Sequence, residues 1–560
     1  MSSTRKVFLG ILPISWILVI CQTTLPVLGD DPCFDHGPDN VTGNYAICID
    51  RESCPSEPIA VDACPSYPTN YACCYHRNFP GREHRGTWIA TVNNMDWPRS
   101  ASSNVSTQQN ELRELLDKIA QAGLNAVYFQ VRPAGDALYI SDLEPWSIYL
   151  TGDPQGTQPS PVWDPLQFVI DYCKPLNIEV HAWINPYRAR FGTPSSAGLH
   201  PNHMAVQFPR CAYPYDIYLW MDPGCGEVED RTVNVARDLV TRYDLDGLHM
   251  DDYFYPYPVS GIPFPDDITY NEYLSSGGGL PKPDWRRENV NRLVQRLNVE
   301  LHEIKPWIRF SVSPFGLFRA GHPDGMPSPP IVQGLDQYAE IYCDAKLWLK
   351  EGWVDIMQPQ LYWRIAPAIQ SYPILLDWWV GAGQNPKGRH VYAGNYLSRV
   401  DLQNWPIDEI RNQVEISREP VNRLRGSWGN VHFSSAMFRD DFGGYLISYF
   451  ANMIYPEPAL QPAYPWLANA TYARVETMQP LITIDDKVNI LVENGSSMKG
   501  IVHKIVIYKE SQVGWNIVKI LDAGYFDGSI KLLGLEKGHF SAHFINRFGQ
   551  ESRKTFFKIL

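Results

Sequence analysis

Two adjacent acidic residues, Asp251 and Asp252, stand at the end of the stretch of this sequence that is best equipped for chemistry. Over residues 247–252 apolar and polar residues alternate, which is typical of a strand. The strand leads into a loop of tyrosine, phenylalanine and proline that cannot continue a sheet. Hydrolysis of a glycosidic bond usually requires two carboxyl groups, one as nucleophile or base and one as proton donor. The alternation places Asp251 on the polar face, and we expect it to be the nucleophile or base.

The second carboxyl group must come from a loop, and the sequence offers several candidates. They are Asp252, Asp136, Glu144 and Asp440. Asp252 points to the opposite face as long as the strand stays regular. Glu144 has a tryptophan two residues away that could exclude water and raise its pKa, as a proton donor requires. The structural alternative is that Asp251 is a buried partner of His249 and does no chemistry.

Eight strand-like segments alternate with eight amphipathic segments after residue 85. The strands are expected at 86–93, 126–132, 179–185, 247–252, 309–313, 355–362, 390–396 and 430–437. The helices are expected at 107–122, 164–175, 228–243, 285–304, 335–350, 367–380, 407–417 and 443–452. Eight alternations predict an α/β fold with a closed (β/α)₈ TIM barrel, whose site lies on the loops that follow the strands.

The strand faces that carry polar residues are expected to point into this barrel. A core built only for stability would contain Val, Ile and Leu, whereas buried polar groups cost folding free energy unless they are satisfied. So many polar side chains at one end of a barrel therefore indicate a binding site. The predicted substrate-binding residues are Asn93, Arg132, Trp183, Asn185, Tyr187, His249, Tyr253, Gln358, Gln360, Tyr362 and Asn395. His181 and His249 lack the spacing of common metal motifs, so no metal and no cofactor is expected.

Composition points to a secreted protein that acts on carbohydrate. The net charge of −13 without basic runs makes nucleic acid and anionic membranes poor partners, and 13% aromatic residues favour a polysaccharide, because sugar rings stack on aromatic faces. Residues 1–29 combine two basic residues, an apolar run and a small-residue cleavage site, which predicts a signal peptide and an extracellular location. Glycosylation sequons occur at Asn40, Asn104, Asn469 and Asn494.

Two further domains are expected to flank a barrel at 79–465. Residues 30–78 are too few to fold without covalent staples, and they carry a framework of six cysteines. These are Cys33, Cys48, Cys54, Cys64, Cys73 and Cys74. A further bridge between Cys211 and Cys225 could staple a barrel loop. Residues 466–560 show short alternating runs and are expected to form a small β-sandwich of the fibronectin III or immunoglobulin type.

Two families resemble parts of this sequence. The cysteine spacing in 30–78 resembles the clip domain, which implies pairing of the first cysteine with the fifth, second with fourth and third with sixth, and a protein partner. Six motifs in order resemble the glycosyl-hydrolase-like family 10 domain, at 85–97, 129–139, 144–147, 181–188, 246–258 and 358–363. This second resemblance implies a TIM barrel with glycosidase-type chemistry. A bacterial member is similar to enzymes that cut peptidoglycan glycan strands lacking stem peptides.

These observations predict a secreted glycoside hydrolase that cleaves a polysaccharide, with an amino-sugar polymer such as peptidoglycan glycan strands as one candidate. In this interpretation Asp252, Glu144 or Asp136 supplies the acid. The competing hypothesis is a secreted carbohydrate-binding protein of innate immunity or matrix that has lost turnover. It is favoured by the presence of a single carboxylate, Asp251, among the inward strand residues.

Overall fold

The computed structural model describes residues 47–50, 71–74, 81–101, 104–322, 334–366, 370–468, 473–484, 490–493, 501–511, 514–523, 529–532 and 534–560. The chain divides into two compact units. The larger holds residues 78–510 and 516–560, and the smaller holds mainly residues 1–39 and 44–77. In the smaller unit two strands, β1 (Ile47–Asp50) and β2 (Tyr71–Cys74), form an antiparallel pair. The signal peptide and the side chains of the six cysteines predicted to bridge within residues 30–78 lie outside what the structure describes.

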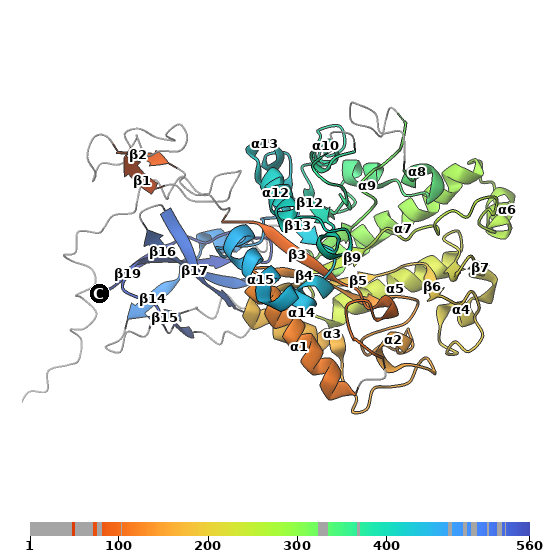
Figure 1. Cartoon of the computed structure of the whole chain (residues 1–560), viewed down its shortest axis with the longest axis horizontal. Helices are drawn as coiled ribbons and strands as arrows, with labels where there is room; N and C mark the ends of the chain where they lie inside the picture. The colour runs from red at the N-terminus through yellow and green to blue at the C-terminus, as the bar shows by residue number, and fades with distance from the viewer. Residues whose placement is uncertain are drawn as a thin grey trace, which may run out of the picture. The chain divides into compact units, whose positions relative to one another are not determined.

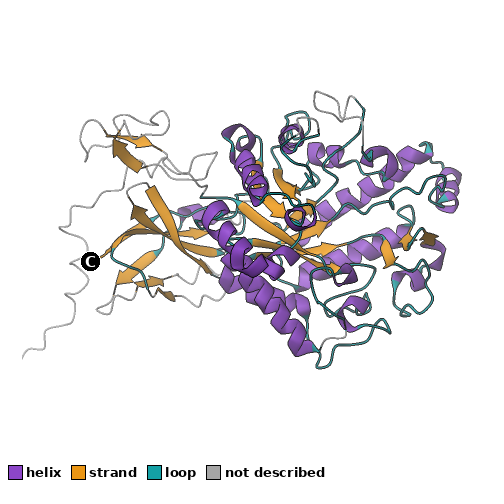
Figure 2. Ribbon diagram, viewed as in Figure 1, coloured by secondary structure: helices purple, strands orange, loops and turns teal. Residues whose placement is uncertain are grey.

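Eight parallel strands close into a barrel, which confirms the predicted fold class (Figures 1 and 2). They are β3 (His84–Ile89), β4 (Ala126–Arg132), β5 (Glu179–Ile184), β9 (Gly247–Met250), β10 (Arg309–Val312), β11 (Ile356–Met357), β12 (His390–Asn395) and β13 (Ser427–His432). Each strand pairs with the next along the chain, and β13 pairs with β3 to close the ring. Several strands end earlier than their alternation predicts. The segment expected at 355–362 keeps only β11, because Pro359 has no N–H to give to a sheet.

Helices follow most of the barrel strands and pack their apolar faces around them. The main ones are α1 (Val105–Gln121), α3 (Pro165–Cys173), α5 (Gly226–Arg242), α7 (Lys282–Ile304), α8 (Gln337–Glu340), α9 (Ala345–Glu351), α10 (Tyr372–Trp379), α12 (Ile407–Arg418) and α15 (Tyr445–Tyr449). In α1, Leu112, Leu116 and Ile119 are fully buried, as the amphipathic pattern predicts. The helix expected at 335–350 is two short helices, because Tyr342 adopts a positive φ of 57° that a helix cannot contain.

The loops at the carboxyl ends of the strands carry small elements of their own. After β5 come β6 (Arg188–Phe191), β7 (Ala212–Tyr215) and β8 (Tyr218–Met221), which form a three-stranded antiparallel sheet. Shorter helices complete these and the remaining connections. They are α2 (Ile148–Thr151), α4 (Met204–Gln207), α6 (Asp267–Ser275), α11 (Arg399–Leu402), α13 (Pro420–Arg423) and α14 (Ala436–Asp440).

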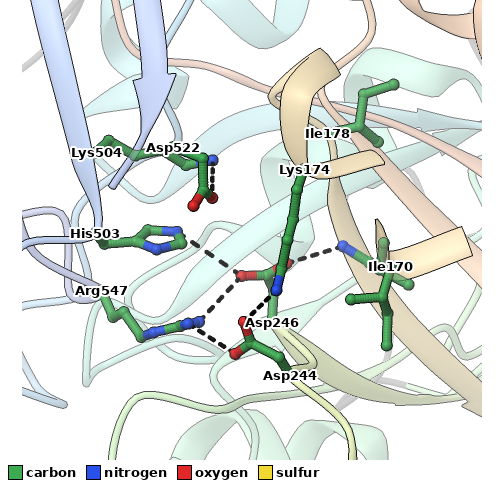
Figure 3. A pocket seen from close by; sticks show the side chains of 10 residues that line it. Ile170, Lys174, Ile178, Asp244, Asp246, His503, Lys504, Asp522 and Arg547 are labelled. Atoms are coloured by element: carbon green, nitrogen blue, oxygen red, sulfur yellow. Dashed lines mark hydrogen bonds and ion pairs between the residues drawn. The ribbon is translucent and has the colours of Figure 1, made fainter. Parts of the chain in front are cut away.

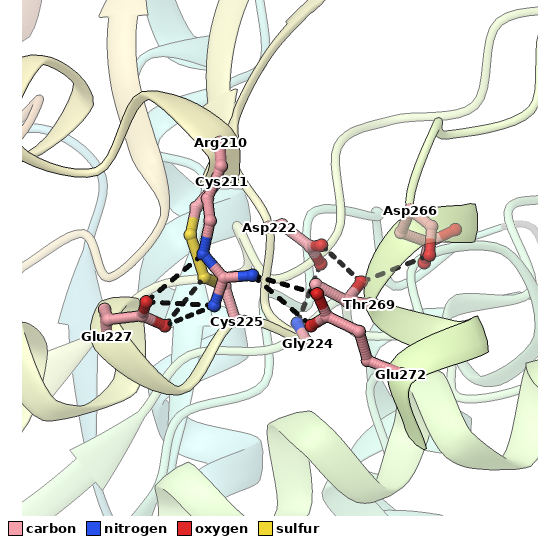
Figure 4. Close-up of a disulfide and its surroundings, with 9 residues drawn as sticks. All are labelled: Arg210, Cys211, Asp222, Gly224, Cys225, Glu227, Asp266, Thr269 and Glu272. Carbon is pink, nitrogen blue, oxygen red and sulfur yellow. Dashed lines mark hydrogen bonds and ion pairs between the residues drawn. A yellow bond between two sulfur atoms is a disulfide. The ribbon is translucent and has the colours of Figure 1, made fainter. Parts of the chain in front are cut away.

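A disulfide between Cys211 and Cys225 closes the loop that contains β7 and β8, as the sequence predicts (Figure 4). Beside it, Arg210 forms ion pairs with Glu227 at 2.9 Å and with Glu272 at 3.1 Å. The disulfide therefore links the β7–β8 hairpin to the start of α5, and the ion pair of Arg210 with Glu272 links it to α6. Cys173, at the end of α3, and Cys343, between α8 and α9, are free and buried.

Replacing Cys211 and Cys225 together by serine is expected to destabilise the barrel loops. The bridge spans 14 residues, and closing a loop of this length stabilises the folded state by about 3 kcal/mol. Chemical denaturation of the double variant should show a lower midpoint, and Arg210→Gln serves as a control for the exposed ion pairs, which contribute at most about 1 kcal/mol. An unchanged midpoint in the double variant would show that the loop is held by packing alone.

The C-terminal region is all-β and has its own apolar core. One sheet has the order β14 (Leu481–Ile484), β15 (Ile490–Glu493) and β18 (Ser529–Leu532), and the other β17 (Gly514–Asp522), β16 (Lys504–Ser511), β19 (Gly538–Ile545) and β20 (Thr555–Ile559). Ile505, Phe540 and Phe544 are buried in this core. The region is therefore built of two sheets, and their packing as a sandwich of the fibronectin III or immunoglobulin type stays a prediction.

Charged side chains join the C-terminal region to the barrel around a small cavity (Figure 3). Arg547 forms an ion pair with Asp244 at 2.7 Å, and its carbonyl oxygen accepts a hydrogen bond from Arg309 of β10 at 3.0 Å. Asp244 is also paired with Lys174, at 2.9 Å. These contacts involve the amino-terminal ends of the strands, the end that TIM barrels use for stability. None of the described helices combines the length and apolar character that a membrane crossing needs.

Candidate active site

Asp251 and Asp252 follow the last residue of β9, at the carboxyl end of the barrel strands where TIM barrels carry their sites. Only 6% of Asp251 and 5% of Asp252 is exposed. The expectation that Asp252 points away assumed a regular strand through residue 252. Because β9 ends at Met250, Asp252 instead accepts a hydrogen bond of 2.6 Å from the Tyr257 hydroxyl and another from the Gln360 side chain. The two carboxyl groups therefore belong to one site.

Asn185 holds Asp251 from the neighbouring strand end. Its Nδ2 donates to Asp251 Oδ1 at 3.2 Å. Its Oδ1 accepts the backbone N–H of Arg188 at 2.9 Å, which fixes the orientation of the amide. Arg132 Nη1 adds a hydrogen bond of 2.6 Å to the carbonyl oxygen of Asn185. Asn185, which the sequence predicted as a substrate-binding residue, is fully buried and orients the Asp251 carboxylate.

The electrostatics of the pair favour a single proton near neutral pH. Burial, together with the charge of Asp252, raises the pKa of Asp251 to about 7, and Arg188 opposes the rise. Burial also raises the pKa of Asp252, against hydrogen bonds from Tyr257 and Gln360 that stabilise its ionised form. Because the charge of Asp252 shifts the pKa of Asp251, the two carboxyl groups titrate as a unit. One protonated and one ionised carboxyl is the combination that glycoside hydrolysis requires.

Of the other three acid candidates, Asp440 forms an ion pair with Arg439 at 2.8 Å, and Glu144 and Asp136 lie near Arg132. Glu144 Oε1 accepts a hydrogen bond from Arg132 Nη2 at 2.9 Å, while its Oε2 is buried and has no hydrogen-bond partner among the residues that the structure describes. Burial raises the pKa of Glu144, as the sequence suggested. Asp136 is fully buried and accepts the backbone N–H of Ala134 at 3.1 Å. Neither is among the strongest electrostatic influences on the pair.

His249 is a buried structural residue of the barrel interior. The Trp88 indole donates to His249 Nε2 at 3.0 Å, and Ser311 Oγ lies 2.8 Å from Nδ1. Burial lowers the pKa of His249 well below its usual value, so the ring is neutral. None of its hydrogen bonds reaches Asp251. The alternative in which Asp251 serves only as the partner of His249 is therefore not what the structure shows.

Several predicted substrate-binding residues are placed where a sugar has no access. Gln358 is fully buried and donates to the Tyr128 hydroxyl. Asn395 is fully buried and donates to Gln413 of α12 at 2.8 Å. Tyr187 is 1% exposed and packs in the apolar core. We correct these three predictions, because a polar face identified by alternation can turn towards a helix or a closed interior as well as towards the barrel mouth.

The remaining predicted residues differ in their access. Asn93 is exposed in a single turn, Val92–Asn94, that follows β3 after the strand has ended. Trp183 is 5% exposed, and its indole N–H has no hydrogen-bond partner among the described residues.

The exposed start of α1 carries the sequon residue Asn104, whose side chain caps the helix by accepting the Thr107 N–H at 2.9 Å. The other three sequons lie outside the described residues.

Half-buried aromatic rings surround the carboxyl pair. Tyr253 stacks on Tyr257 with ring centres 5.2 Å apart, and Tyr257 lies 5.7 Å from Phe315. On loops that follow other strands, Tyr362 lies 4.5 Å from Tyr396. Burial, with Asp252 and Asp251 nearby, raises the pKa of Tyr362 well above its usual value. These rings offer apolar faces of the kind on which sugars stack.

Among the described residues, one grouping of His, Cys, Asp and Glu has a spacing that fits a metal ion. It consists of Cys211, Cys225 and Glu227, and its two sulfur atoms are bonded to each other. His181 and His249 form no such grouping with Asp251.

Comparisons with known proteins agree with this architecture. A family model described as glycosyl hydrolase-like 10 matches residues 83–407. Glycosyl hydrolase YngK of Bacillus subtilis is 36% identical over 416 residues, which cover 73% of this chain and 79% of that protein. The chain belongs to the glycosyl hydrolase-like 10 family. Glycosyl hydrolase DigH of Escherichia coli K12 is 32% identical over 383 residues, which cover 64% of this chain and 83% of that protein.

Solved structures are much more distant. The catalytic domain of β-amylase from Paenibacillus polymyxa is 12% identical, with a TM-score of 0.43, and the alignment covers 67% of this chain and 98% of that one. The spore cortex-lytic enzyme SleL of Bacillus megaterium is 9% identical, with a TM-score of 0.36, over 67% of this chain and 75% of that one. The family assignment therefore rests on the sequence relatives and the family model.

Proposed function

We propose that the chain is a secreted glycoside hydrolase that cleaves glycosidic bonds within a polysaccharide. The family and the names of its relatives support the reaction class. The observation that carries the proposal is the buried pair of Asp251 and Asp252, where one carboxyl can hold a proton while the other is ionised. The aromatic rings around the pair supply surfaces for sugar binding.

The hydrogen bonds favour Asp251 as the proton donor and Asp252 as the ionised partner. Asp252 accepts a short bond from Tyr257 and another from Gln360, and such donors stabilise a carboxylate. Asp251 accepts one side-chain bond, 3.2 Å long, from Asn185, and its other hydrogen bonds come from the backbone N–H groups of Asp251 and Tyr253. In the proposed reaction Asp251 protonates the leaving oxygen, and Asp252 stabilises the oxocarbenium-like transition state or activates the attacking group. These roles reverse the assignment that strand alternation suggested for Asp251.

Secretion is proposed from the sequence of residues 1–29 and from the sequons. The exposed position of Asn104 at the start of α1 is compatible with glycosylation there. An amino-sugar polymer such as peptidoglycan glycan strands is the first substrate class to test, because the motif resemblance described above implies it; the names of the bacterial relatives support only the reaction class. A protein partner bound through residues 30–78 remains part of the proposal.

The substrate is found by incubating the full-length secreted protein with a panel of polysaccharides and measuring new reducing ends. The panel includes peptidoglycan glycan strands without peptides, chitin, mannan and neutral glucans. We expect time-dependent reducing ends from at least one amino-sugar polymer. Binding to a glycan without any new reducing ends would favour the carbohydrate-binding protein instead.

The rate is expected to fall as pH rises through about 7. The proton donor must be protonated, and burial raises the pKa of Asp251 to about 7, so its proton is lost above that value. The expected profile of kcat/KM against pH is bell-shaped, with its alkaline limb reporting this group. A rate that stays constant from pH 6 to pH 9 would show that Asp251 does not act as the acid.

A further inference from the structure

Arg188 is the first residue of β6, and its guanidinium is buried near the carboxyl pair. Its exposed fraction is 3%. Nε donates to the carbonyl oxygen of Pro133 at 3.0 Å, and Cζ lies 4.7 Å from the centre of the Tyr253 ring. Nη2 is buried, and no described residue forms a hydrogen bond with it. In the part of the chain that the structure describes, Arg188 forms no direct ion pair with a carboxylate.

Arg188 is connected to both members of the pair through the residues that hold them. Its backbone N–H fixes the amide of Asn185, and this amide donates to Asp251. Its guanidinium covers Tyr253, which stacks on Tyr257, and the Tyr257 hydroxyl donates to Asp252. The guanidinium therefore has a fixed position in the wall of the site.

The ionisable groups that face the pair come from several elements. Besides Arg188, they are Tyr218 on β8, Tyr253 and Tyr257 after β9, Cys343 before α9 and Tyr362 after β11. Burial raises the pKa of each of these tyrosines and of the thiol, so all are neutral near pH 7. Arg188 is thus the cation among the described groups that act most strongly on the pair.

We propose that Arg188 is the counter-charge of the Asp251–Asp252 pair, a positioning residue that lets one carboxylate ionise while the other keeps its proton. A buried guanidinium without a partner is costly unless negative charge lies near it. One ionised carboxyl balances that charge, whereas two would leave a net negative charge in a buried site. The inference rests on the proposed function of the pair, and it adds the group that sets the pair's proton content.

Three variants distinguish the effect of the Arg188 charge from the effect of Arg188 packing. Arg188→Gln removes the charge, Arg188→Lys keeps it, and Arg190→Gln is the matched control. The Arg190 guanidinium donates to the carbonyl oxygens of Ser195 and Ala197, away from the pair. A nearby cation lowers a carboxyl pKa by about 1–3 units, so Arg188→Gln is expected to shift both limbs of the kcat/KM profile to higher pH by about one unit or more. Arg188→Lys and Arg190→Gln should keep the limbs near their wild-type positions.

A second readout does not depend on turnover. Carboxyl ¹³C signals of labelled aspartate in the full-length protein, assigned by their loss in Asp251→Asn and Asp252→Asn, report the titration of the pair directly. The same upward shift is expected in Arg188→Gln. If this shift occurs but no glycan is cleaved, the inference stands and the proposed function fails.

Two results would overturn the inference. One is an unchanged titration of the pair in a folded Arg188→Gln protein, and the other is an equal shift in Arg188→Lys, which would mean that Arg188 acts through its packing. If Arg188→Gln does not fold, the titration of the pair in the wild-type protein and in Arg188→Lys still tests the inference. A pair that takes up no proton between pH 5 and pH 9 in both proteins would contradict the charge balance described above.

Discussion

Asp251→Asn is expected to reduce the turnover of a natural glycan by about a hundredfold or more, the range of a lost general acid. The substitution keeps the size of the side chain but removes the transferable proton. Glycan binding should persist, because Asn185 and the surrounding aromatic rings are unchanged. Steady-state release of reducing ends and a separate binding measurement on the same glycan would check both parts.

The same variant should be at least as stable as the wild type above pH 7. Burial raises the pKa of Asp251 to about 7 in the folded protein, while the unfolded chain has an ordinary aspartate. The folded state therefore binds more protons between these values, and stability is lost as pH rises towards 7. Asparagine removes this loss, so the melting temperature of the variant should exceed that of the wild type more at pH 7.5 than at pH 4. A protein that unfolds on this substitution would make Asp251 a structural residue.

Asp252→Asn is expected to have a comparably large effect for a different reason. This carboxylate is the negative charge that would stabilise the oxocarbenium-like transition state, and losing such a preorganised charge costs about a hundredfold or more in rate. The acidic limb of the pH profile should also disappear, because the Asp252 carboxylate, whose protonation would stop the reaction, is no longer present. Tyr257→Phe is the graded control, since it removes the hydrogen bond to Asp252 and leaves the charge.

A near-normal rate in Asp252→Asn would contradict the pairing of the two carboxyl groups. In that case Glu144, whose Oε2 is buried and has no hydrogen-bond partner among the described residues, becomes the next acidic residue to replace. Glu144→Gln alone is not expected to abolish the acidic limb, because the residue is engaged by Arg132.

The barrel itself could be predicted from the sequence because its elements repeat a strong pattern. Each predicted strand has a counterpart among β3 to β5 and β9 to β13, and α1 buries the apolar stripe that its spacing predicts. The ends of the elements were harder to predict. Tyr342 splits one predicted helix, and Pro359 shortens β11, because local backbone geometry overrides periodicity.

The site could be predicted only in part, since its arrangement depends on contacts between distant segments. Asp251 was found from alternation, but the position of Asp252 depends on Tyr257 and Gln360. Alternation also cannot tell a barrel mouth from a contact with a helix, which is why Asn395 was assigned to the substrate. Arg188 lies in the same sequence motif as Asn185, and this position is the signal in the sequence that could have identified Arg188 as part of the site.

The measurement that tests the account most directly compares two substrates on the two single variants. A natural glycan needs its leaving oxygen protonated, whereas an aryl glycoside with an acidic phenol leaves without help. We expect Asp251→Asn to recover most of the wild-type rate on the aryl glycoside and Asp252→Asn to stay slow on both. Equal rates for wild type and both variants on the natural glycan would contradict the claim that this pair is the catalytic centre.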